Sequence, residues 1–332
     1  MVSKYFYRFA LISTIFVIVL LSLKIDNTQF QLPSVTNDEW DRKRISEEFC
    51  NRQNDFEIQV FEAPEVQPLA SGKIFCLVLT TFNRHQTRAK FVADTWGKQC
   101  DGLMFVSDQT DPFLTGSKKF SNSSNYGSLW TKVRNSFQWS FDHFGQQFDW
   151  YLKSDDDTFV NIPKLRLVLQ NFDSRSKWYF GKRFLGVVVG NDSNSVQDDR
   201  IISYADGGSG YILSKATLHS LVTEAFHNKE KCAQSEVSTA EDIQMGSCLA
   251  SIGLSPFSFV EKSTRCDLFV IRPPWKNVSK WQMNKEEYMK HLSEPCPGAG
   301  QRWFCAEGAN MLTIHQVIGN EMKKMFEKWG ST

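Results

Sequence analysis

Three consecutive carboxylates, Asp155, Asp156 and Asp157, are the residues of this chain that most clearly could do chemistry. They follow residues 150–154, a mostly apolar run with the length of a buried strand. Like charges packed together without a cation cost electrostatic and desolvation free energy. Side chains at positions i and i+2 of an extended segment point the same way, so Asp155 and Asp157 can face one metal ion while Asp156 faces elsewhere. The alternative is a solvated acidic turn ahead of the next helix.

Two other patches are candidates on residue type alone. Glu241 and Asp242 open a helical pattern that extends to residue 252, and the partly positive amide groups of a helix start favour ionised carboxylates. An ordinary acidic first turn is the alternative there. Residues 206–211 form a glycine-rich turn ahead of an apolar pair and a helix that starts at Lys215; taken alone, they indicate a turn that needs positive φ.

Several common catalytic motifs are absent from the sequence. It contains no G-x-S-x-G, no H-E-x-x-H and no C-x-x-C. The glycine-rich turn also lacks the G-x-G-x-x-G spacing that follows a strand in dinucleotide-binding folds. These absences exclude the common hydrolase, zincin and thiol-redox classes and leave a dinucleotide-binding fold unsupported.

The elements that must position these groups alternate between strands and helices. Apolar runs of strand length are followed by segments with helical periodicity, and Asn161 with Pro163 opens the helix after the acidic triplet. This alternation predicts an α/β fold with a mainly parallel sheet and helices on both faces, whose ligands bind at the carboxyl ends of the strands. The tail, residues 317–329, has the pattern of an amphipathic helix that covers the core. The expected strands are residues 74–80, 103–107 and 150–154, and the expected helices are residues 88–96, 129–144 and 242–252.

Composition and charge exclude further classes of protein. The chain has 332 residues, 41% hydrophobic and 23% charged, which excludes a mainly disordered chain. Its formal net charge is +1 and it has no long basic run, so no nucleic-acid partner is expected. Its eight cysteines are an even number, as expected of paired cysteines in an oxidising compartment.

The N-terminus predicts a membrane anchor. Residues 9–23 carry no charge, and with the residues just before them they approach the thickness of the hydrocarbon core of a bilayer. Lys4 and Arg8 precede this stretch, so the positive-inside rule places the start of the chain in the cytosol and the rest in the lumen. A cleaved signal peptide is the alternative, but no small-x-small cleavage site follows. The expected parts are a cytoplasmic tail (residues 1–8), a transmembrane signal anchor (9–23), a stem without regular periodicity (24–72) and a lumenal domain (73–332).

Three N-x-[ST] sequons follow the predicted anchor and agree with a lumenal placement. Each is therefore an expected N-glycosylation site in a secretory compartment. The asparagines are Asn122, Asn191 and Asn277.

Four motifs follow one another along the chain. They are Trp150-Tyr-Leu-Lys-Ser-Asp-Asp-Asp-Thr-Phe-Val160, Trp178-Tyr-Phe-Gly-Lys-Arg-Phe184, Gly207-Gly-Ser-Gly-Tyr-Ile-Leu-Ser-Lys215 and Glu241-Asp-Ile-Gln-Met-Gly-Ser-Cys248. Together they resemble the fringe-like β-1,3-glycosyltransferases, and among these most of all the core 1 β-1,3-galactosyltransferases. The resemblance extends over about residues 73–317 and implies a single nucleotide-sugar-binding domain of GT-A type in a type II Golgi membrane enzyme, in agreement with the predicted anchor and stem.

The resemblance implies a role for each matching residue. Asp155 and Asp157 would hold a divalent cation, usually Mn²⁺, against the donor pyrophosphate, and His315 stands where the family has its third ligand. Asp242 matches the family's catalytic base, and Glu241 is then structural or orients the acceptor. The other residues implied to bind donor or acceptor are Trp130, Lys132, Asp156, Gly207, Gly208 and Tyr211.

The family also pairs cysteines at similar places. One implied disulfide encloses the first strand–helix unit and another brackets the Glu-Asp motif, where it would fix the loop of the base. Connectivity does not follow from sequence alone, so these pairings are hypotheses. They are Cys76 with Cys100 and Cys232 with Cys248. Among the remaining cysteines, we expect Cys266 to pair with Cys296 or Cys305.

The expected activity is inverting transfer of galactose from UDP-galactose, in β-1,3 linkage, to O-linked GalNAc on glycoproteins. A β-linkage formed from an α-linked nucleotide sugar requires a carboxylate base opposite the leaving group and a cation to take up charge on the diphosphate. A fringe-type or other β-1,3-transferase is the first alternative, because residues 266–302 depart from the galactosyltransferase pattern. A catalytically silent, chaperone-like relative is the second, and the complete acidic triplet argues against it. The expected partners are glycoprotein acceptors and the membrane, and a homodimer is left open.

Overall fold

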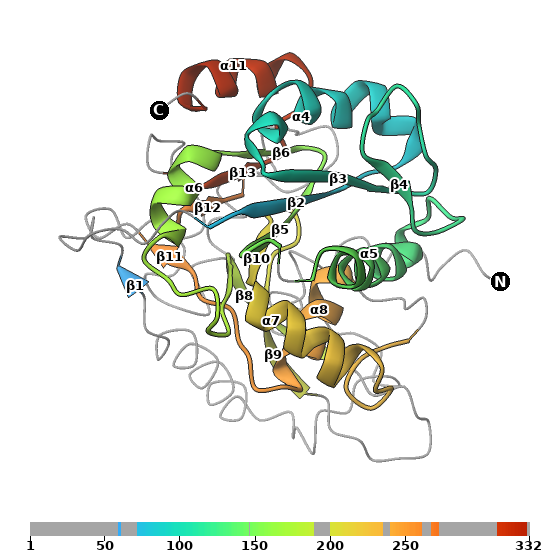
Figure 1. Cartoon of the computed structure of the whole chain (residues 1–332), viewed down its shortest axis with the longest axis vertical. Coiled ribbons are helices and arrows are strands. Elements are labelled where there is room, and N and C mark those ends of the chain that lie inside the picture. Colours follow the sequence, from blue (N-terminus) through green and yellow to red (C-terminus); the bar gives the residue numbers. More distant parts are fainter. Residues whose placement is uncertain are drawn as a thin grey trace, which may run out of the picture.

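A six-stranded mixed sheet forms the centre of the computed structural model (Figure 1). In spatial order its strands are β4 (Ser117–Lys119), β3 (Gly102–Ser107), β2 (Ile74–Leu79), β5 (Trp150–Asp155), β10 (Tyr211–Ser214) and β7 (Tyr179–Gly181). The first four strands run parallel to one another, whereas β10 runs antiparallel to both of its neighbours. The α/β class with a parallel-rich sheet is therefore confirmed, and the sequence did not predict the antiparallel edge.

The structure describes residues 59–60, 72–145, 147–188, 200–234, 240–260, 267–271 and 311–330. The predicted anchor, residues 9–23, lies outside these ranges, as does almost all of the predicted stem. Within the ranges described, no helix combines the length and the apolar character needed to cross a bilayer. The membrane anchor therefore stays a prediction.

The side chains of the central strands alternate between two hydrophobic cores, one on each face of the sheet. In β2, for example, Cys76 enters the first core and its neighbour Leu77 enters the second. A strand buried on both faces needs apolar side chains throughout, which is why β2 is an unbroken apolar run. Helices cover both faces, as predicted (Figure 1). The first core is covered by α4 (Lys90–Asp94), α6 (Ile162–Leu169) and α11 (Asn320–Trp329), and the second by α5 (Leu129–Phe144), α7 (Lys215–Ser220) and α8 (Glu241–Ala250).

The helix predicted over residues 88–96 starts earlier than predicted and is divided. A π-helical turn, η2 (His85–Ala89), precedes α4, and a 3₁₀ turn, η3 (Trp96–Gln99), follows it. The division falls at Thr95, whose backbone leaves the helical region and whose hydroxyl donates a hydrogen bond to the carbonyl of Phe91 at 2.6 Å. A threonine hydroxyl that binds the preceding turn in this way competes with the regular helical hydrogen bonds.

The other predicted helices lie close to their expected bounds. α5 coincides with the predicted residues 129–144, α8 covers most of 242–252, and α11 lies within the predicted tail. α6 begins after Asn161, whose side chain accepts a hydrogen bond from the amide of Lys164 and so caps the helix. Local periodicity and capping residues therefore located most of the helices.

A small second sheet places β13, near the C-terminal end of the described residues, beside the strand that follows the acidic triplet. β6 (Thr158–Val160) follows the triplet directly and pairs antiparallel with β13 (Thr313–His315). β13 in turn pairs in parallel with β12 (Phe269–Val270). The remaining elements are the antiparallel pair β8 (Arg183–Val188) and β9 (Arg200–Ala205), the parallel pair β1 (Gln59–Val60) and β11 (Phe259–Val260), and the short helical turns η1 (Phe82–Arg84), η4 (Tyr126–Ser128) and η5 (Leu221–Phe226).

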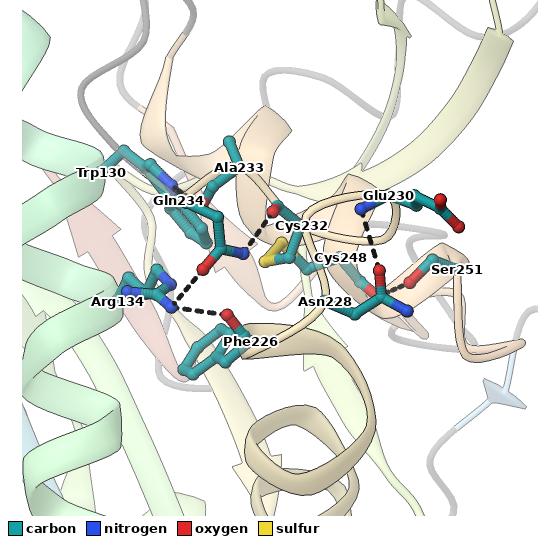
Figure 2. The surroundings of a disulfide bond; sticks show 10 residues. All are labelled: Trp130, Arg134, Phe226, Asn228, Glu230, Cys232, Ala233, Gln234, Cys248 and Ser251. Atoms are coloured by element: carbon teal, nitrogen blue, oxygen red, sulfur yellow. Dashed lines mark hydrogen bonds between the residues drawn. A yellow bond between two sulfur atoms is a disulfide. The ribbon is translucent and has the colours of Figure 1, made fainter.

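Two disulfides lie within the described residues, and both are pairings that the family resemblance implied. The Cys76–Cys100 bond joins β2 to the residue after η3. The Cys232–Cys248 bond joins the turn after η5 to α8 (Figure 2). The indole of Trp130, on α5, donates to the carbonyl of Ala233 at 2.9 Å, so α5 holds the same turn. The other predicted pairings lie outside the described residues, on Cys266, Cys296 and Cys305.

Replacing Cys232 and Cys248 together by serine is expected to lower the free energy of unfolding by about 3 kcal/mol. The two cysteines are 16 positions apart in sequence, and opening a loop of that length restores conformational entropy to the unfolded chain. Urea unfolding of the variant beside the wild type measures the difference. Ser251→Ala, a change that removes a hydrogen bond to the Cys248 carbonyl and leaves the disulfide intact, should cost no more than about 1 kcal/mol. Equal stability of the serine variant and the wild type would contradict this expectation.

Candidate active site

The acidic triplet lies at the carboxyl end of β5, in the centre of the sheet. Asp155 is the last residue of β5, and Asp157 ends the turn that leads into β6. His315, the last residue of β13, pairs with Thr158 across the antiparallel register, and the amide of Val317 donates to the Asp157 carbonyl at 2.8 Å. Asp155, Asp157 and His315 each offer one ligand atom, and these atoms lie within 4.8 Å of one another. The structure thus brings together the three residues proposed as cation ligands.

These three side chains fit a divalent cation. Two carboxylate oxygens and an imidazole nitrogen suit manganese or a similar ion. Nε2 of His315 lies 3.3 Å from Oδ1 of Asp157. Burial opposes the protonated imidazolium, but the hydrogen bond and charge of Asp157, together with Asp206 and Asp155, raise the pKa of His315 to about 9. The carboxylates therefore attract positive charge to this point, and a bound cation would take the place of the ring proton.

Asp156 lies in the turn after β5 and faces away from this cluster, as expected from the sequence. Only 2% of it is exposed, and its Oδ2 accepts a hydrogen bond from the hydroxyl of Thr80 at 2.7 Å. Burial and the charge of Asp157 raise the pKa of Asp156 to about 7. Asp156 therefore anchors the triplet to the end of β2 and does not face the same point as its two neighbours.

The glycine-rich turn packs against the histidine. A Cβ atom on Gly208 would lie 2.3 Å from Cε1 of His315, a distance that real contacts do not reach. The hydroxyl of Thr158 donates to the carbonyl of Gly208 at 2.6 Å and holds the turn in place. Gly210 adopts a φ of +86°, so the positive φ expected of this turn occurs there. Close approach to an imidazole ring therefore explains the glycine at position 208.

Gly208→Ala is expected to displace the imidazole ring of His315 and to weaken Mn²⁺ binding by about 10- to 100-fold, the usual effect of disturbing the support of a metal ligand. Titration of the purified chain with Mn²⁺ measures the affinity. His315→Ala is the matched variant, and adding Gly208→Ala to it should weaken binding little further, because both changes act through the same ring. Independent, additive losses would show that Gly208 acts on something other than His315.

Glu241 and Asp242 begin α8 on the other side of the same turn. The carboxylate of Asp242 accepts hydrogen bonds from the amides of Gly207 and Ile243, both at 2.9 Å. The sequence suggested that the start of the helix favours an ionised carboxylate, but burial, followed by the charges of Glu241 and Asp206, raises the pKa of Asp242 to about 7. The buried surroundings therefore outweigh the amide groups of the helix start.

Glu241 is buried and fully partnered. Its Oε1 accepts a hydrogen bond from the hydroxyl of Tyr211 at 2.7 Å, and its Oε2 accepts one from Nζ of Lys153 at 3.0 Å. A Cβ atom on Gly207 would lie 2.9 Å from Oε2 of Glu241, so the turn also packs closely against this carboxylate. These contacts agree with the structural alternative for Glu241 that the sequence left open.

Trp130 and Lys132 occupy buried positions on α5. Trp130 is 1% exposed and packs in the second core, with its indole on the Ala233 carbonyl. Lys132 is fully buried, with Nζ 3.5 Å from the carbonyl of Thr80 and 3.9 Å from Oδ1 of Asp108. Trp130 therefore packs in the core and holds the turn that contains Ala233, whereas Lys132 lies beside the residues that follow β2 and β3. Their role in binding the donor stays a prediction.

Two cationic residues that the sequence did not mark as candidates contact the carboxylates. Arg88, on η2, places Nη1 2.7 Å from Oδ2 of Asp157 and 3.5 Å from Oδ1 of Asp156. Lys153 lies inside β5 and donates to Asp155 as well as to Glu241. A lysine in a mostly apolar run of strand length was a signal available in the sequence, since lysine is seldom buried without a partner. No comparable local signal marked Arg88.

The model of the family described as Fringe-like matches residues 69–261 of the chain. The chain is 26% identical over 182 residues to glycoprotein-N-acetylgalactosamine 3-beta-galactosyltransferase 1 of Xenopus laevis, covering 55% of this chain and 46% of that protein. It is 25% identical over 197 residues to the Fringe glycosyltransferase of Drosophila melanogaster, covering 57% and 48% of the two chains.

The beta-1,3-glucosyltransferase of Mus musculus is 23% identical over 187 residues, covering 56% of this chain and 35% of that protein. The chain thus spans less than half the length of these three curated relatives. Among solved structures, a glycosyltransferase involved in the glycosylation of the major capsid of PBCV-1 matches with a TM-score of 0.36 and 14% identity, covering 77% of this chain and 99% of that one.

Proposed function

Since the chain belongs to the Fringe-like family of β-1,3-glycosyltransferases, we propose that it moves galactose from UDP-galactose, in β-1,3 linkage, to O-linked GalNAc on glycoproteins. One observation carries the proposal. The adjacent residues Gly207 and Gly208 contact the two halves of the site: the amide of Gly207 binds Asp242, and Gly208 packs against His315. One turn therefore contacts both a candidate base and a candidate cation site, the two groups that an inverting transferase uses.

Asp155, Asp157 and His315 would hold the divalent cation, and their donor atoms favour Mn²⁺ over a cation that prefers oxygen alone. When bound, the cation supplies positive charge that stabilises the departing diphosphate of the donor. Asp156 holds the triplet in register through its hydrogen bond to Thr80. The contribution of the chain is therefore a rigid carboxylate cluster at the end of β5, which orients the donor.

Asp242 is the proposed base. Hydrogen bonds from two backbone amides fix the orientation of its carboxylate, and a pKa of about 7 suits a group that takes up a proton near neutral pH. In the proposed step, the acceptor hydroxyl loses its proton to Asp242 as its oxygen bonds to the anomeric carbon of the donor. The bond from that carbon to the diphosphate oxygen breaks on the opposite face, which inverts the anomeric configuration.

A second candidate keeps the chemistry and changes the sugar. The chain is 26%, 25% and 23% identical to a galactosyltransferase, a Fringe glycosyltransferase and a glucosyltransferase. These sequence identities are too similar to indicate which donor sugar the chain uses. A fringe-type transferase that uses UDP-GlcNAc is therefore the main alternative. A silent, chaperone-like relative is disfavoured, because the candidate cation site and the candidate base are both complete.

The proposed setting is the Golgi lumen. The predicted anchor at residues 9–23 would make the chain a single-pass type II membrane protein with the domain from residue 73 onward in the lumen. Asn122 is exposed, as a glycosylation site must be, whereas Asn191 and Asn277 lie outside the described residues. The two disulfides also suit an oxidising compartment.

A donor and acceptor screen tests this proposal. The purified chain is incubated with Mn²⁺, one of UDP-galactose, UDP-GlcNAc or UDP-glucose, and either a GalNAc-bearing glycopeptide or a panel of other glycans. Galactose transfer to the glycopeptide, with β-1,3 linkage established by NMR, is the expected result. Transfer of another sugar would favour the fringe-type alternative, and no transfer from any donor would favour the silent relative.

A further inference from the structure

A buried lysine connects the two halves of the site. Lys153 lies on β5, two positions before Asp155, and only 2% of its surface is exposed. Its ammonium group donates to Oδ1 of Asp155 at 2.9 Å, to Oε2 of Glu241 at 3.0 Å and to the carbonyl of Gly207 at 3.1 Å. An ammonium group has three protons, and each has an acceptor here. The lysine is therefore fully satisfied by one particular arrangement of its neighbours.

The three acceptors belong to three elements that are far apart in the sequence. Asp155 ends β5 and belongs to the candidate cation site, Gly207 belongs to the glycine-rich turn, and Glu241 opens α8 immediately before Asp242. The opposite oxygen of Glu241 is held by Tyr211, so the first turn of α8 is fixed from both sides. If the ammonium group of Lys153 were absent, the negative charges of Asp155 and Glu241 would lie near each other without a positive charge between them.

We propose that Lys153 is a positioning residue that links the cation site to the base. It holds the first turn of α8, and with it Asp242, at a fixed separation from Asp155. Its charge also competes with a cation for the carboxylate of Asp155, which keeps cation affinity moderate. The catalytic consequence rests on the proposed function, whereas the consequence for cation affinity can be measured without any transfer reaction.

Lys153→Met separates these consequences. It removes a positive charge beside Asp155, so Mn²⁺ should bind about tenfold more tightly in the absence of donor. It also releases the first turn of α8, so kcat for transfer should fall by about 10²-fold with little change in the KM for the donor. Calorimetric titration with Mn²⁺ and steady-state kinetics measure the two effects. If Lys153 only supported the fold, its replacement would lower both the Mn²⁺ affinity and kcat. A higher Mn²⁺ affinity together with a lower kcat therefore identifies the link.

Lys153→Arg separates charge from geometry. Arginine keeps the positive charge, so Mn²⁺ affinity should stay within about twofold of the wild type. The planar guanidinium group does not direct three protons from one point, so kcat for transfer should stay well below that of the wild type. Lys215→Met is the matched control. Lys215 donates to Asp149 at 2.9 Å, a partly buried lysine–aspartate pair at the other end of β5, and its loss should leave both Mn²⁺ affinity and kcat near wild type.

The outcomes distinguish this inference from the proposed function. Wild-type kcat in Lys153→Met, or Mn²⁺ binding weakened in parallel with kcat, would overturn the inference while the function stands. If the wild type transfers no sugar and Lys153→Met still binds Mn²⁺ more tightly, the proposed function fails and the competition between lysine and cation is supported. Thermal unfolding shows whether Lys153→Met is folded. If it is not folded, Lys153→Arg carries the test, and a wild-type kcat in that variant would overturn the inference.

Discussion

Asp242→Asn is expected to reduce the rate of sugar transfer by at least about 10²-fold. Asparagine is nearly isosteric, and its amide oxygen can still accept the hydrogen bond from Gly207, but it does not take a proton from the acceptor hydroxyl. Donor binding with Mn²⁺ should persist, because the proposed cation ligands lie on the other side of the glycine-rich turn. Steady-state kinetics beside titration with UDP-galactose test both statements. Undiminished turnover would assign the base to another residue.

The same variant should change the pH dependence of the reaction. Burial and the neighbouring acids raise the pKa of Asp242 to about 7, and only the ionised carboxylate acts as a base. The wild-type rate should therefore rise with pH, reach half its plateau near the pKa of Asp242, and fall about tenfold for each unit below it. Asp242→Asn should lose this midpoint, whereas Glu224→Gln, a change in a surface pair with Lys177, should keep it. A midpoint that persists in Asp242→Asn would place the titrating group elsewhere.

Asp157→Ala is expected to abolish transfer and to remove the dependence of donor binding on Mn²⁺. The carboxylate of Asp157 is one of three groups whose ligand atoms lie within 4.8 Å of one another, and it also contacts His315 at 3.3 Å. Donor titrations with and without Mn²⁺ measure the effect. Asp173→Ala, which removes an exposed carboxylate paired with Arg175, is the control and should retain both activity and Mn²⁺ dependence.

The fold of the Asp157→Ala variant should persist. The substitution takes one negative charge from a cluster of like charges, but it also removes the partner of Arg88 and His315, so the two effects on stability oppose each other. Thermal unfolding near the wild-type temperature is therefore expected. Full activity of Asp157→Ala in the presence of a chelator would show that the acidic triplet is an ordinary solvated turn and binds no catalytic metal ion.

Much of the site was predictable from local sequence, because local geometry controls it. The alternation of side chains in an extended segment predicted that Asp155 and Asp157 group together, and their ligand atoms do lie close, although Asp156 and Asp157 form a turn between β5 and β6. The unbroken apolar run of β2 and the helical period of α5 located their elements for the same reason. The assignment of His315 came only from the family resemblance, since nothing in its neighbourhood of the sequence marks it.

Only the tertiary structure decided how these local pieces meet. The antiparallel pairing of β13 with β6 sets His315 opposite Thr158, and a shift of one residue would turn the imidazole away from the triplet. The antiparallel β10 brings the glycine-rich turn back over the end of β5, where Lys153 joins Asp155 to Glu241. Burial raises the pKa of Asp242, although its place at a helix start favours the ionised form. Strand register, ion pairing and burial arise from residues distant in the chain, and so local periodicity does not encode them.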